Sequence, residues 1–101
     1  MKHRHYYILI DDEAVPCEDV ATWARWFETA ERHVATDRVG GVQVSTVFLG
    51  LDHDWGLGPL PVLWETMIFG GPHDEYQERY TSRTAALAGH QRALALVQSR
   101  A

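Results

Sequence analysis

The tripeptide Asp52-His53-Asp54 combines residue types that commonly carry chemistry. Two carboxylates and an imidazole can hold a divalent cation, or can pair a general base with an orienting acid. Neighbours on one loop rarely point toward a common centre, so a metal would need further ligands, for which Glu65 and His73 are candidates. Asp and His are also ordinary turn residues. The tripeptide therefore fits a metal or catalytic centre, a binding contact, or a plain turn.

Trp55 follows these residues in a segment, 52–61, that contains two glycines and two prolines and is expected to be a loop. A tryptophan exposed on such a loop is typical of a contact hot spot, and the alternative is a lid packed over one end of the sheet. We expect the binding residues to be Asp52, His53, Asp54, Trp55 and His73. We expect no catalytic residue, no bound metal and no cofactor, because no serine-nucleophile, His-Glu-x-x-His or Walker pattern occurs.

His90 is the odd residue of the last expected helix, where it shares an apolar stripe with Leu87, Leu94 and Val97. Its neighbour Gly89 lowers the stability of the helix by about 1 kcal/mol relative to an alanine in mid-helix. A close approach of the helix to the sheet or to another helix would explain that glycine. We interpret His90 as a core histidine that is hydrogen-bonded to a strand or a loop.

Alternating and helical hydrophobic patterns predict the elements that position these residues. The expected order is β-α-β-β-β-β-α, an α+β fold in one domain, 1–101. We expect an antiparallel sheet of four or five strands, with two amphipathic helices on one face. Strands are expected at 6–10, 33–39, 42–51, 62–69 and 75–80, and helices at 17–32 and from 81 or 82 onward; 14–16 is a short extension that Pro16 excludes from a central strand.

Composition narrows the function classes. Fourteen acids against nine bases give a net charge of −5, which argues against general nucleic-acid binding. No apolar run reaches the roughly 18–20 residues that span a bilayer, so no membrane association and a cytoplasmic location are expected. The single cysteine, Cys17, cannot form an internal disulfide. It is either a small half-buried side chain near a helix start or a reactive thiol.

Several segments together resemble a family of small uncharacterised proteins of bacteriophages and prophages. The resemblance extends from about Tyr7 to about Leu94, and it is carried by the segments 16–19, 23–28, 44–53, 65–67, 69–71 and 88–90. The resemblance brings no catalytic residue with it. It implies a phage accessory protein in the cytoplasm of a bacterial host, and small acidic phage proteins include inhibitors of host defence such as anti-CRISPR proteins.

Three functions stay open at this point. The first is a phage accessory protein that binds a host or phage protein, with inhibition of a defence system as one mode. The second is a small metal-dependent or nucleotide-handling enzyme that uses Asp52, His53 and Asp54. The third is a homo-oligomeric module, such as a homodimer, joined through a sheet face or through the Trp55 loop.

Overall fold

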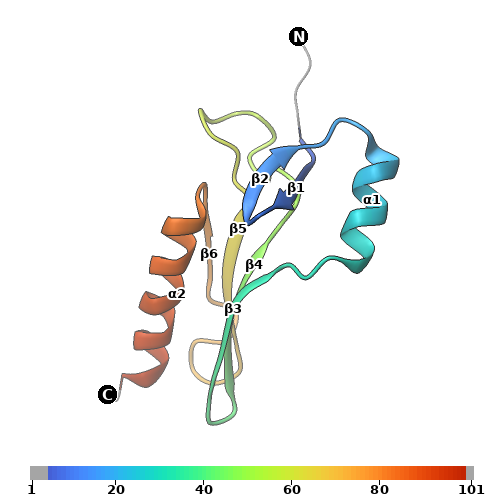
Figure 1. The fold of residues 1–101 in the computed structure, drawn as a ribbon. Coiled ribbons are helices and arrows are strands. Elements are labelled where there is room, and N and C mark those ends of the chain that lie inside the picture. Colours follow the sequence, from blue (N-terminus) through green and yellow to red (C-terminus); the bar gives the residue numbers. More distant parts are fainter. Residues whose placement is uncertain (1–4, 100–101) are drawn as a thin grey trace.

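The computed structural model describes residues 5–99 (Figure 1). Eight elements follow one another along the chain. They are β1 (Tyr7–Ile10), β2 (Glu13–Pro16), α1 (Val20–Thr29), β3 (His33–Val39), β4 (Val42–Phe48), β5 (Trp64–Phe69), β6 (Gln77–Tyr80) and α2 (Arg83–Gln98). The expected α+β class is confirmed, and the order of the helices relative to the later strands is as expected.

The strands form two antiparallel sheets, which corrects the expected single sheet of four or five strands. β3, β4, β5 and β6 make a meander in sequence order, and β1 pairs with β2 in a separate hairpin. Asp11 and Asp12 both adopt positive φ, 51° and 67°, which suits a tight two-residue hairpin turn. The short extension before Pro16 is therefore a full strand, and Pro16 ends it at the edge of a hairpin, where its missing N–H is tolerated.

Helix α2 covers one face of the meander and contacts all four of its strands. The register places Val44, Thr46 and Phe48 of β4 on this covered face, level with Ile68, Thr66 and Trp64 of β5. Five of these six side chains are fully or almost fully buried, and Trp64 is 4% exposed. The core therefore lies between α2 and the meander.

Helix α1 packs mainly on the hairpin, and Figure 1 shows it across the strands from α2. Among the strands it contacts β1, and its Trp26 ring meets the edge of Phe48 at the end of the core. The Trp23 Nε1–H donates to the carbonyl oxygens of both Tyr7 and Gly50, at 3.0 and 2.9 Å. Only α2 therefore covers a face of the meander, which corrects the expected placement of both helices on one face of one sheet.

The helix boundaries differ from expectation at local caps. α1 begins at Val20 rather than at Cys17, because the Asp19 carboxylate accepts the Ala21 N–H as an N-cap. Cys17 is half-buried just before this cap. Ser82 caps α2 by accepting the Ala85 N–H at 3.1 Å, which confirms one of the two expected caps.

The buried stripe of α2 differs from the expected one. Leu87 is 36% exposed, and Leu94 and Val97 are half-buried, whereas the fully buried positions are Ala86, Gly89, His90 and Ala93. A Cβ at Gly89 would overlap the ring and hydroxyl of Tyr80, so the helix approaches β6 on its smallest residues. The close approach expected at Gly89 is confirmed, and it turns the larger Leu87 outward.

Within residues 5–99, neither helix has both the length and the apolar character required to cross a lipid bilayer.

Candidate functional site

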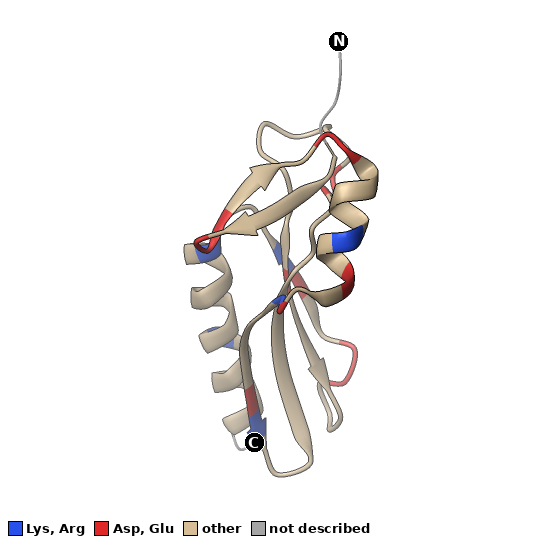
Figure 2. Ribbon diagram, turned by 45° about the vertical axis from the view of Figure 1, so that its right-hand side comes forward, with Lys and Arg blue, Asp and Glu red and all other residues tan. Residues whose placement is uncertain are grey.

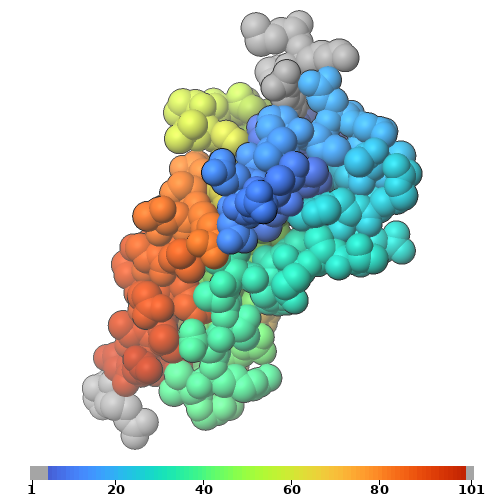
Figure 3. All heavy atoms as spheres, in the orientation of Figure 1, coloured from blue at the N-terminus to red at the C-terminus, as the bar shows by residue number. Residues whose placement is uncertain are grey.

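The segment 52–62, here called the 52–62 loop, connects β4 to β5 and projects as a knob beyond the end of the meander (Figure 3). Asp52 organises it. Oδ1 accepts the N–H groups of Asp54 and Val62, and Oδ2 accepts the N–H of Gly56, each at 2.9 Å. The side chain is only 2% exposed. One buried carboxylate therefore ties the beginning, the middle and the end of the loop together.

Two opposing effects act on the pKa of Asp52. Burial raises it, while the hydrogen bonds from Val62, Asp54 and Gly56 and the nearby His5 lower it. The lowering effects prevail, so the pKa lies below its ordinary value. Asp52 is therefore ionised at neutral pH, and its charge serves the backbone of its own loop.

The other two residues of the tripeptide are also engaged locally. The His53 ring Nδ1 lies 2.8 Å from the carbonyl oxygen of Leu51, so Nδ1–H is the donor. The Asp54 carbonyl oxygen accepts the Leu57 N–H at 2.9 Å as part of a turn. No group of three or more His, Cys, Asp or Glu residues able to hold a metal ion occurs between residues 5 and 99. The metal-site alternative gains no support here, since the oxygens of Asp52 accept three backbone N–H groups of their own loop.

The tip of the loop is apolar and solvent-exposed. Trp55 is 59% exposed, Leu57 88% and Leu60 58%. Trp55 has a φ of 53°, and its indole lies 5.4 Å from the His5 ring. This exposure favours the contact interpretation of Trp55 over the lid interpretation. Leu57 and Leu60 were missed in the sequence, although apolar residues alternating with Gly and Pro outside any helical or strand period are a usable signal.

His73 does not belong to the same site. The 52–62 loop precedes β5, whereas His73 lies in the turn that follows β5. Six strand residues of about 3.3 Å each separate the two by roughly 20 Å. His73 instead lines a small hollow beside the end of α2, together with Val42, Gly70, Pro72, Val97 and Ser99. The five expected binding residues are therefore split between opposite ends of the sheet.

Glu65 is also directed elsewhere. It lies on the face of the meander opposite α2, where Oε2 accepts hydrogen bonds from Arg79 at 2.9 Å and Gln77 at 2.7 Å. It is 8% exposed, so the ion pair satisfies a carboxylate that would otherwise be costly to bury. It supplies no ligand to the loop.

A second polar constellation lies under α2. The His90 Nε2 is 2.7 Å from Asp37 Oδ2, and its Nδ1 is 2.7 Å from the Thr46 hydroxyl, which in turn contacts Thr66. The acid–imidazole–hydroxyl order resembles a nucleophile relay, but Thr46 is 0% exposed and no substrate can reach its hydroxyl. His90 is thus the core histidine expected from the sequence, while Asp37, 53 residues earlier, gave no sequence signal.

The opposite edge of α2 has a matching attachment. Arg92 donates to Glu78 of β6 at 3.0 Å, and the Tyr80 hydroxyl donates to the same carboxylate oxygen at 2.9 Å. Burial chiefly raises the pKa of Tyr80 to about 12, with Thr66 lowering it and Glu78 raising it further. The Tyr80 phenol therefore stays neutral as a donor. α2 is held to both edge strands, through Asp37 of β3 and Glu78 of β6.

Comparison of the chain with models of protein families, with curated proteins and with solved structures finds no match.

Proposed function

We propose that this chain is a non-enzymatic binding protein whose 52–62 loop inserts into a partner protein. The observation that carries the proposal is the exposed tip of Trp55, Leu57 and Leu60 on a loop that a single buried carboxylate holds in place. Apolar side chains gathered in water mark interaction sites. A loop that is already ordered loses less conformational entropy on binding, so more of the contact energy is available as affinity.

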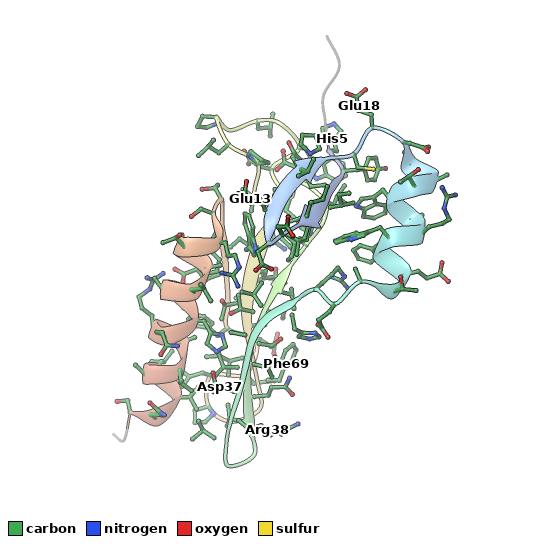
Figure 4. The ribbon with its side chains drawn as sticks, in the orientation of Figure 1. His5, Glu13, Glu18, Asp37, Arg38 and Phe69 are labelled. Atoms are coloured by element: carbon green, nitrogen blue, oxygen red, sulfur yellow. The ribbon has the colours of Figure 1, made fainter. Side chains whose placement is uncertain are left out.

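The charge near the tip supports a partner with a basic rim. The sequence from Val39 to Glu78 contains no Lys or Arg, and Asp54 lies beside Trp55. Glu18 and Asp19 add acidic charge at the same end of the molecule, where α1 begins (Figure 2; Glu18 is labelled in Figure 4). Acidic charge near an apolar contact favours partners of the opposite sign. An apolar groove flanked by Lys or Arg therefore fits this loop.

The setting of this function follows from the sequence resemblance. We propose a phage or prophage accessory protein in the cytoplasm of a bacterial host, with a host or phage protein as partner. Inhibition of a host defence complex is one form that such binding takes. A basic complex that handles nucleic acid would present the cationic rim that the acidic end of this chain suits.

The test is a capture experiment with matched variants. The wild-type chain, Trp55→Ser/Leu57→Ser and Leu87→Ser are used as baits in bacteria during phage infection, and each captured protein is purified for titration calorimetry. Leu87 is exposed on α2, away from the loop, so its variant controls for general loss of apolar surface. We expect the double variant to weaken binding at least 100-fold and the control to match wild type. Equal affinity of all three would overturn the proposal.

A further inference from the structure

The face of the meander opposite α2, here called the open face, is a second surface with no covering element among residues 5–99. Its centre is formed by Ser45 and Val47 of β4 with Met67 and Phe69 of β5, since these positions alternate with the buried ones. α2 packs on the other face, and α1 packs on β1 and reaches the meander through the contact of Trp26 with Phe48 at its end. Figure 4 shows Asp37 on the α2 side and Arg38 and Phe69 on the side away from it.

The open face has an apolar centre. Val47 and Met67 are half-buried, and Phe69 is 46% exposed. No charged residue lies between them along the two central strands except Glu65, whose carboxylate is neutralised by Arg79. Such a surface is suited to packing against another flat surface, as the inner faces of two sheets do in a sandwich.

The corners of the open face alternate in charge. Register places Arg38 of β3 level with Phe69, and Arg79 of β6, which is also the ion-pair partner of Glu65, level with Val47 at the other end. Acids occupy the remaining corners. Glu31 lies beside His33 at the β3 edge, level with Val47. Glu75 lies on the turn that precedes β6, where its N–H donates to the carbonyl oxygen of Ile68, the residue before Phe69. The two cations are therefore diagonal to each other, and so are the two acidic corners.

We propose that the open face binds the open face of a second copy of this chain. A two-fold axis lying in the interface makes a surface meet itself, so only a self-complementary pattern is accepted. An axis along the strands exchanges the β3 and β6 edges, and it places Arg38 over Glu75 of the other copy. An axis across the strands exchanges the two ends instead, and it places Arg38 over Glu31. Because the charges alternate from corner to corner, both arrangements bring opposite charges together.

The choice of axis decides how the dimer presents its loops. With the axis along the strands, both 52–62 loops point from the same end of the dimer. With the axis across the strands, they point from opposite ends. The first arrangement would let one dimer engage two neighbouring sites on one partner, which raises apparent affinity without any new contact.

The size of the open face predicts a weak dimer. Four strands about 4.8 Å apart and roughly 20 Å long cover about 400 Å² in plan. Stable interfaces bury about 800 Å² per partner, so this contact belongs to the transient class. We expect a dissociation constant in the micromolar range or weaker, and a dimer that dissociates further as salt screens the corner charges.

Sedimentation velocity of the full chain, from about 10 μM to 1 mM, tests the proposal. We expect the sedimentation coefficient to rise with concentration. Phe69→Glu should remain monomeric throughout, while Leu57→Glu, a charge added on the loop, should dimerise as wild type does. A wild-type monomer at 1 mM, or a dimer that survives Phe69→Glu but not Leu57→Glu, would overturn the open face as the interface.

Charge reversal identifies the axis. Arg38→Glu should weaken self-association about 10-fold, since it makes two corners repel. Native mass spectrometry of Arg38→Glu mixed with Glu75→Lys, and separately with Glu31→Lys, should give a mixed dimer in one mixture only. A mixed dimer with Glu75→Lys places the loops at the same end, and one with Glu31→Lys places them at opposite ends. No mixed dimer in either mixture would contradict the corner contacts.

The result is independent of the loop proposal. Trp55→Ser/Leu57→Ser leaves the open face intact and should dimerise as wild type does. Phe69→Glu leaves the loop intact and should still bind the captured partner as a monomer. Either proposal, the loop as a partner-binding site or the open face as a dimer interface, can therefore be refuted while the other stands.

Discussion

The 52–62 loop and the interface between α2 and the meander, here called the α2 interface, use buried polar groups for opposite purposes. In the loop, the carboxylate of Asp52 accepts three backbone N–H groups, and the apolar residues Trp55 and Leu57 face water. Under α2, the imidazole of His90 and the hydroxyl of Thr46 are buried and bonded to each other. One region exposes apolar surface on a polar anchor, and the other buries polar groups between a helix and a sheet.

This difference shows where side-chain identity is constrained by structure. The α2 interface contains small helix residues and a chain of hydrogen-bonded polar side chains. Its stability therefore depends on close packing and on complete hydrogen bonding. The apolar side chains at the loop tip are mostly in water, and the ring contact of Trp55 with His5 is the one packing interaction described for them here. That contrast is the physical ground for the proposal that the loop binds a partner while α2 supports the fold.

The largest expected effect is at Gly89. Helix propensity alone predicts that Gly89→Ala stabilises by about 1 kcal/mol. The added Cβ would instead overlap the Tyr80 ring, so we expect a loss of about 4 kcal/mol in the free energy of unfolding. Gly41→Ala is the control, because a Cβ there meets nothing within 4 Å. Urea denaturation measures both, and a stabilised Gly89→Ala would refute the close packing of α2 on β6.

His90 gives the next largest effect. His90→Leu keeps volume but removes the partner of Thr46 and of Asp37, and we expect a loss of about 3 kcal/mol. Asp37→Asn should cost less than about 1 kcal/mol, since the amide oxygen still accepts the Nε2–H and this edge residue is half exposed. Thermal and urea unfolding give both values. Equal costs for the two variants would contradict a buried hydroxyl–imidazole chain.

The fold was predictable where periodicity was local. The meander, its Gly40-Gly41 turn and the Ser82 cap follow from alternation and turn chemistry. The hairpin strand Glu13–Pro16 was predicted only as a short extension at 14–16, because Pro16 argues against a central strand, whereas the edge of a two-stranded hairpin tolerates it. The stripe of α2 was predicted correctly at His90, and Leu94 and Val97 pack against the core, but Leu87 is exposed because the close contact of Gly89 with Tyr80 brings small residues to the interface.

The candidate site was predictable in part. Asp52 and Trp55 share a loop as expected, because they are adjacent in the sequence. His73 was predicted to belong to the same site, but it follows β5 whereas the loop precedes β5. The two therefore lie at opposite ends of that strand. The Asp37–His90 bond joins residues 53 apart, and no local pattern in a single sequence encodes such a pair.

Asp52 tests the anchor of the loop. Asp52→Ala leaves three N–H groups without an acceptor, and we expect a loss of about 2 kcal/mol together with faster hydrogen exchange at Gly56 and Val62. Asp54→Ala is the matched control and should leave both amides protected. Equal exchange in the two variants would show that Asp52 does not hold the loop.

Acid should release the same anchor. Because the folded pKa of Asp52 lies below its ordinary value, its contribution is present above about pH 4, the unfolded pKa, and is lost as pH falls through the folded pKa. Asp52→Asn should therefore show a flatter loss of stability below pH 4 than wild type. Parallel acid profiles of the two proteins would contradict this contribution.

The smallest expected effect is the one that most sharpens the contrast. Trp55→Ser and Leu57→Ser remove apolar side chains that are already mostly in water, so each should change the free energy of unfolding by less than about 0.5 kcal/mol. Urea denaturation checks this with Ile68→Ala as the buried comparison, for which we expect about 3 kcal/mol. A cost above about 1 kcal/mol at Trp55 would mean that its contact with His5 supports the fold. A null effect leaves the exposed tip without a structural role, and binding then becomes the reason for residues that folding does not require.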